Sequence, residues 1–161
     1  MDANTRKILV AELASLLEKG FAHGALEDAC AGIPADKLNQ RVPQVPYTIW
    51  ELVEHIRIAQ YDILDFSRNP AYQTLDWPAA YWPDRAQPVD EATFQRTVQQ
   101  ITHDREEFLR LLQDPALDLL APFPHGTGQS LLREAMLIAD HNSYHLGQLI
   151  LLRRLLGIWE E

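Results

Sequence analysis

The stretch LLREAMLIADHNSYHLGQLILLRRLL, residues 131–156, decides the fold because it reads as one long amphipathic helix. Its apolar residues recur at alternating steps of three and four, the spacing of a helix face that is buried against other helices. Ser130 lies where this helix should begin, and Gly157 suits the position just after its end. The predicted buried stripe consists of Leu131, Ala135, Ile138, Asn142, His145, Leu149, Leu152 and Leu156.

Two histidines of this helix, His141 and His145, are four residues apart. That spacing brings both imidazoles onto one helix face, about one turn apart, where they can share a metal ion. The pair alone leaves a second interpretation open, because two histidines hydrogen-bonded to neighbours at the edge of a core have the same spacing.

Three earlier segments also have helical periodicity: residues 4–19, a segment that runs from Thr48 until Pro70 ends it, and residues 90–113. Thr48 and Glu51 fit a capping box at the start of the second of these helices. No segment shows the alternation of a strand, and no internal repeat is visible. The sequence therefore predicts an all-α fold, most simply a four-helix bundle, with residues 1–161 as one domain.

The connections between these helices are unusually long, at residues 20–47 and 69–89. This length indicates crossover connections rather than the short hairpins of an up-and-down bundle. The second connection contains the aromatic residues Trp77, Tyr81 and Trp82. Because loops of this length commonly form lids or pocket walls, we expect this segment to contribute to a site.

A third histidine, His55, follows Leu52 by three residues and borders the apolar stripe of its helix. Together with His141 and His145 it could hold one metal ion and leave coordination positions open, as in catalytic rather than structural sites. Glu51 lies one turn before His55, so we expect its carboxylate to accept a hydrogen bond from the second ring nitrogen. The alternative is that Glu51 acts only as a capping residue.

Two further residues are candidates for positioning or catalysis. Gln148 follows His145 by three residues and could either orient that imidazole or contact a ligand on the metal. Tyr144 could orient the same ligand, although it lies about 100° around the helix from His145. Of the other histidines, we expect His103 to be solvated and His125 to lie too far along the helix axis to share the metal.

Composition limits the classes of partner. The 161 residues include 14 Lys and Arg against 23 Asp and Glu, a formal net charge of −9. This balance argues against general binding to nucleic acid or to an anionic membrane, so the expected partner is a small-molecule substrate. The single cysteine, Cys30, cannot form an internal disulfide, and neither a signal peptide nor a membrane-spanning run is visible. The cytoplasm is therefore the expected location.

Two segments resemble a known family. YTIWELVEHI (residues 47–56) is similar to a motif of the DinB/YfiT-like superfamily that ends in a histidine. DHNSYHLGQ (residues 140–148), followed by LRRLLG (residues 152–157), is similar to the motif on the fourth helix of that superfamily. Trp82-Pro83 in the second long connection also fits.

The resemblance implies a four-helix bundle with crossover connections, often homodimeric, that binds one divalent metal ion through three histidines. These positions match His55, His141 and His145, and either zinc or nickel suits such a site. Some members of the superfamily are S-transferases or isomerases that use low-molecular-weight thiols, and others are hydrolase-like.

Two functions follow as hypotheses. Three neutral ligands leave the charge of a zinc ion uncompensated, so the ion would lower the pKa of water to about 7 or hold a thiol as thiolate. Attack by the thiolate would give thiol transfer, and attack by hydroxide would give hydrolysis. The alternative is a stress-associated, non-catalytic bundle in which the metal only ties two helices together.

Overall fold

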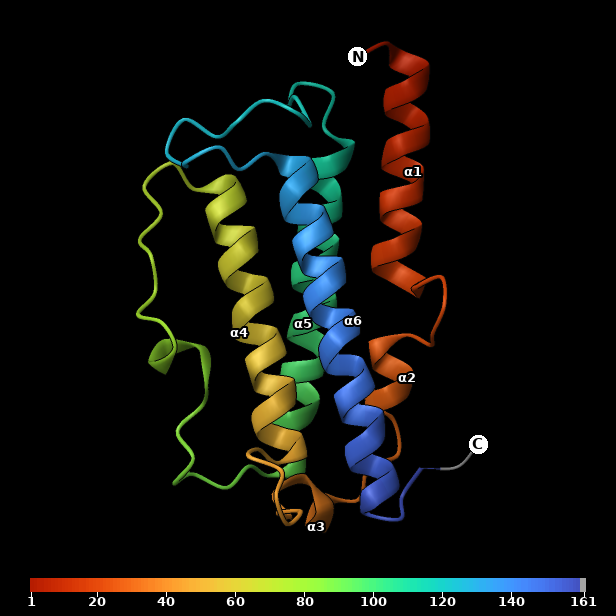
Figure 1. The fold of residues 1–161 in the computed structure, drawn as a ribbon, viewed down its shortest axis with the longest axis vertical. Helices are drawn as coiled ribbons and strands as arrows, with labels where there is room; N and C mark the ends of the chain where they lie inside the picture. The colour runs from red at the N-terminus through yellow and green to blue at the C-terminus, as the bar shows by residue number, and fades with distance from the viewer. Residues whose placement is uncertain (160–161) are drawn as a thin grey trace.

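Four long segments of the chain form helices that run side by side: α1 (Ala3–Lys19), α4 (Ile49–Arg68), α5 (Glu91–Gln113) and α6 (Leu131–Leu155). The computed structural model describes residues 1–159. α4 packs against both α5 and α6, and α1 packs against the same two helices (Figure 1). No strand is formed within residues 1–159, so the predicted all-α class is confirmed.

The helix ends follow from local sequence. The Thr48 side chain accepts a hydrogen bond from the backbone of Glu51, and the Glu51 carboxylate accepts one from the backbone of Thr48, which completes the predicted capping box. After α6, Gly157 adopts a φ of 69°, and the Ile158 amide donates to the Arg153 carbonyl at 3.0 Å. This is a Schellman ending, which requires a residue that tolerates the left-handed conformation.

The long connections contain short helices that periodicity did not predict. α2 (Leu26–Cys30) and α3 (Ala35–Leu38) lie in the first connection, and the 3₁₀ turn η1 (Ala79–Tyr81) lies in the second. Each is too short to show a repeating apolar pattern. α2 continues along the side of the bundle where α1 ends and packs on α6 (Figure 1).

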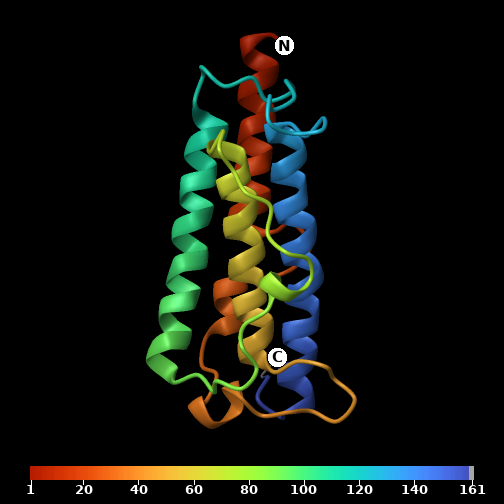
Figure 2. The same cartoon turned by 90° about the vertical axis from the view of Figure 1, so that its left-hand side faces the viewer.

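The second long connection is a crossover. After α4 it returns along the bundle beside that helix, and α5 then begins at the same end as α4 (Figure 2). α4 and α5 therefore run parallel, as a crossover requires. The first connection takes a different course, since it continues in the direction of α1 before α4 turns back (Figure 1). The crossover places η1 against α4.

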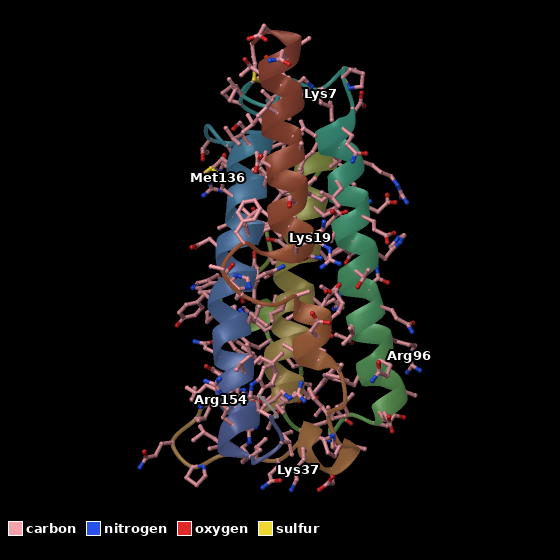
Figure 3. All side chains as sticks on the ribbon, turned by 90° about the vertical axis from the view of Figure 1, so that its right-hand side faces the viewer. Lys7, Lys19, Lys37, Arg96, Met136 and Arg154 are labelled. Carbon is pink, nitrogen blue, oxygen red and sulfur yellow. The ribbon has the colours of Figure 1, made fainter. Side chains whose placement is uncertain are left out.

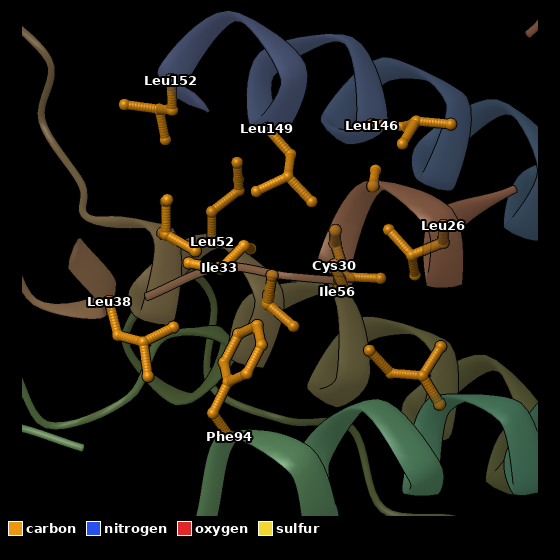
Figure 4. Close-up of a cluster of buried hydrophobic side chains, with 14 residues drawn as sticks. Leu26, Cys30, Ile33, Leu38, Leu52, Ile56, Phe94, Leu146, Leu149 and Leu152 are labelled. Atoms are coloured by element: carbon orange, nitrogen blue, oxygen red, sulfur yellow. The ribbon is translucent and has the colours of Figure 1, made fainter. Parts of the chain in front are cut away.

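The core is divided into two apolar clusters along the bundle axis. One includes Leu52, Ile56, Phe94 and Leu149 and is closed from the side by α2 (Figure 4). The other is built around residues such as Leu64, Phe108 and Ile138. Between them, Gln60 donates to the Ile101 carbonyl at 2.7 Å and accepts from Asn142 at 2.8 Å. A buried polar layer thus links α4, α5 and α6 at mid-height.

The surface is polar and its cations are dispersed. The labelled cations Lys7, Lys19, Lys37, Arg96 and Arg154 are spread along the whole length of the molecule (Figure 3). Of the helices formed by residues 1–159, none combines the length and the apolar character needed to cross a membrane.

Candidate metal centre

The three predicted histidines meet where the two core clusters join. His55 projects from α4, and His141 and His145 project from α6. The Nε2 atom of His55 lies 3.1 Å from Nε2 of His145 and 3.2 Å from Nε2 of His141. His55 and His145 are buried, and the three ligand atoms all lie within 4.8 Å of one another. The prediction that these side chains come together is confirmed.

These separations are those of ligands to one ion. Two nitrogens bound at about 2.0–2.1 Å to a shared metal lie roughly 2.9–3.4 Å apart for angles of 90–110°. The distances of 3.1 Å and 3.2 Å fall within this range. The separations of His55 from both other histidines therefore fit a single divalent cation, and the third pair lies within 4.8 Å.

The outer ring nitrogens decide which atoms face the centre. Nδ1 of His55 lies 2.7 Å from the Tyr81 carbonyl oxygen, and Nδ1 of His145 lies 2.7 Å from the Gln148 side-chain oxygen. Both oxygens only accept, so each Nδ1 carries the proton and each Nε2 presents a lone pair. Two lone pairs 3.1 Å apart repel each other unless a cation lies between them. This arrangement argues against a hydrogen bond between His55 and His145.

The surroundings favour the neutral, ligating form of each imidazole. Burial lowers the pKa of all three histidines. The effect is largest at His141, whose pKa falls to about 4 because of burial and the proximity of the other two rings. Neutral imidazole is the form that binds a metal, so none of the three must lose a proton at neutral pH.

Glu51 does not orient His55, and that prediction is wrong. Its carboxylate accepts from the Thr48 amide at 3.0 Å and forms an ion pair with Arg41. A side chain at the third position of a helix reaches back toward the cap, away from the next turn. The alternative interpretation of Glu51 as a capping residue is the one that the structure supports.

Gln148 and Tyr144 have different positions relative to the centre. Gln148 orients His145 through the Nδ1 contact, which was one of its two predicted roles. Tyr144 is 64% exposed and touches His145 only through its ring, with centroids 4.9 Å apart. A catalytic role for either residue stays a prediction.

Two contributions from the second long connection were not assigned from the sequence. The Tyr81 backbone carbonyl, which has no side-chain signature, holds His55. The indole of Trp82 stacks on the imidazole of His55, with centroids 4.1 Å apart, and Tyr47 also stacks on Trp82. The aromatic composition of this connection and the Trp82-Pro83 pair were the signals available in the sequence.

The other histidines lie outside the centre. As expected, His103 is exposed on α5 and His125 lies outside the cluster, where its ring contacts the Phe66 carbonyl. His23 lies 3.0 Å from the Ser143 hydroxyl. Among residues 1–159 no fourth histidine, cysteine or carboxylate joins the cluster.

Comparison with known families gives one match. The family model of the DinB superfamily matches residues 21–149, which is most of the chain. The chain belongs to the DinB superfamily. All three histidines of the cluster lie within the DinB match, so family and geometry agree on a possible metal site. No curated protein and no solved structure matches the chain.

Proposed function

We propose that this DinB-superfamily protein is a divalent-metal-dependent enzyme that acts on a small molecule through an activated thiol or water. His55, His141 and His145 would hold one ion, with zinc and nickel as the candidates. The observation that carries the proposal is the pair of Nε2 lone pairs 3.1 Å apart, each fixed by a hydrogen bond at the opposite ring nitrogen.

The chain's own groups would prepare the site for this chemistry. A divalent cation supplies Lewis-acid stabilisation of negative charge on a thiol sulfur or a water oxygen. Three protein ligands leave positions open for such a group, as catalytic sites do. Tyr81 and Gln148 hold the ligating tautomers of His55 and His145, and Trp82 covers one face of His55. Tyr144 and Gln148 are the candidates for contacts with the bound molecule.

A thiol nucleophile would have to come from solution. Cys30, the single cysteine, is 3% exposed within the apolar cluster formed with α2. Burial raises the pKa of its thiol to about 12, so it stays protonated. The thiol-transfer version of the proposal therefore uses a low-molecular-weight thiol as a second substrate.

Metal content tests the first half of the proposal. Purified protein should carry or take up one equivalent of zinc or nickel, measured by elemental analysis after dialysis. H55A should lose this equivalent, and the matched control H103A should keep it, because His103 is an exposed histidine outside the cluster. Protein that binds neither ion, or an H55A variant that binds as well as wild type, contradicts the proposal.

Turnover tests the second half. Metal-loaded protein is assayed with cysteine or glutathione and the electrophile 1-chloro-2,4-dinitrobenzene for thiol transfer, and with p-nitrophenyl esters for hydrolysis. We expect one of the two activities to require the metal and to disappear in H55A while the melting temperature changes little. Loss of melting temperature without measurable activity in any form supports the second function below.

The second candidate is a non-catalytic bundle in which the metal is structural. This alternative is favoured because the histidines come from two different helices. An ion bound by His55 and His145 would cross-link α4 and α6 through two buried side chains. A structural metal contributes directly to folding free energy. On this alternative, removal of the metal should lower the melting temperature by many degrees.

The proposed partners are a small molecule and a second copy of the chain, and we propose binding to neither nucleic acid nor a membrane. The proposed location is the cytoplasm. The outer face of α6 has exposed Tyr144, Leu151 and Leu155, a composition compatible with a homodimer. Sedimentation equilibrium at micromolar concentration tests this, and a monomer contradicts it.

A further inference from the structure

A carboxylate two helical turns from the centre is connected to it through the second long connection. Asp62 lies on α4, seven residues after His55 and so on nearly the same helix face. The Tyr81 hydroxyl donates to one oxygen of Asp62 at 2.6 Å, and the Tyr72 hydroxyl donates to the other at 2.7 Å. Both tyrosines belong to the crossover that runs beside α4 (Figure 2).

Tyr81 is held at both ends. Its hydroxyl is bound to Asp62, and its backbone carbonyl accepts the Nδ1 proton of His55 at 2.7 Å. Tyr81 therefore connects two residues of α4, Asp62 and the proposed metal ligand His55. Its only regular structure is the three-residue turn η1, so the position of this carbonyl depends on such anchors.

The two hydroxyls remain donors at physiological pH. Burial and the hydrogen bond to Asp62 raise the pKa of both tyrosines, that of Tyr72 to about 12. Hydrogen bonds from a neutral hydroxyl to a carboxylate are charge-assisted and stronger than neutral ones. Asp62 thus holds the connection strongly, and of the two tyrosines bound to it, Tyr81 is the one that contacts His55.

We propose that Asp62 is a positioning residue for the metal site, acting through Tyr81 to fix the carbonyl that orients His55. The inference rests on the proposed metal binding. Mutation of a group that orients a ligating histidine typically weakens metal affinity by 10–100-fold. Because Asp62 acts through one intervening residue, we expect an effect of about tenfold, at the lower end of that range.

The two tyrosines provide a matched pair of variants. Y81F and Y72F each remove one hydroxyl from the same carboxylate, at nearly equal distances, but only Tyr81 contacts a metal ligand. The measurement is the zinc dissociation constant, obtained by competition with a chromophoric chelator, with the melting temperature of the metal-free proteins as the measure of folding. We expect Y81F to weaken zinc binding about tenfold, and Y72F to stay within twofold of wild type, at similar melting temperatures. Equal affinities in Y81F and Y72F overturn the inference.

A second measurement reports the tautomer of His55 directly. In metal-free wild-type protein, ¹⁵N NMR of the imidazole should show His55 as the Nδ1-protonated tautomer, and in Y81F the two tautomers should mix. A wild-type His55 protonated at Nε2 overturns the inference. Failure of the proposed function and failure of this inference give different results. Wild-type protein that binds neither zinc nor nickel contradicts the proposed function. Zinc binding that is unaffected in Y81F contradicts only the role of Asp62.

Discussion

The imidazole of His55 and the indole of Trp82 lie face to face, with ring centroids 4.1 Å apart and planes inclined by 5°. Trp82 comes from the crossover connection and His55 from α4, so the stack fixes one element on the other. Loss of the stack alone should cost about 1 kcal/mol of unfolding free energy. W82A also removes partly buried apolar surface, so it should cost more than this and weaken zinc binding several-fold. Chemical denaturation and chelator competition measure the two effects.

Trp77 provides the control for this stack. It lies in the same connection but is 71% exposed and contacts Tyr81 rather than His55. W77A should leave zinc affinity within twofold of wild type. If W77A and W82A weaken zinc binding equally, the stack has no special role.

Two substitutions of Gln148 should change the zinc affinity in opposite directions. Q148L removes the oxygen that accepts from Nδ1 of His145 and should weaken zinc binding about tenfold. Q148E replaces the acceptor with a carboxylate, which makes the ring more basic and should tighten binding. Q99L, at an exposed position on α5, is the control and should bind as wild type does. Tighter binding by Q148L would contradict the proposed orientation of His145.

Cys30 should be chemically inert in the native protein. It is buried, and a thiol with a pKa of about 12 is ionised in roughly one molecule in ten thousand at pH 8. Iodoacetamide should therefore modify it only as fast as the protein unfolds, measured by mass spectrometry with and without urea. Rapid labelling of folded protein would contradict this and would reopen Cys30 as the nucleophile.

Asp104 should give the stability a specific pH dependence. It is 2% exposed on α5, accepts from Gln100 at 2.8 Å, and burial raises its pKa. Because the native state binds this proton more tightly than the unfolded chain, the contribution of Asp104 is most favourable below its ordinary pKa of about 4 and declines as the pH rises through the raised value. The stability of D104N relative to wild type should therefore increase between pH 4 and pH 7. Urea unfolding of both proteins measures the difference, and an unchanged difference contradicts the raised pKa.

The sequence predicts those features of the fold and the site that depend on the regular spacing of side chains along a helix. The four long helices, the capping box at Thr48 and the meeting of His55 with His141 and His145 follow from helical spacing, which places side chains without knowledge of the rest of the fold. The family resemblance pointed to the same three histidines, and the match to residues 21–149 supports it.

The features that the sequence does not predict depend on long-range geometry. The Tyr81 carbonyl is a backbone group, and nothing in residue type distinguishes it from any other carbonyl. Glu51 was misassigned because spacing gives its distance from His55 but not the direction in which its side chain turns. The helices α2 and α3, with five and four residues, are too short for periodicity to detect.

His141 and His145 follow His55 in the chain by 86 and 90 residues. No fragment that ends before α6 contains the complete ligand set, and none can hold it until α4 and α6 have paired. Since a ligand that binds only the native state stabilises it by mass action, zinc should raise the melting temperature of the whole molecule rather than of one segment. Ion uptake would then report, for any variant or truncation, whether the chain has completed its folding.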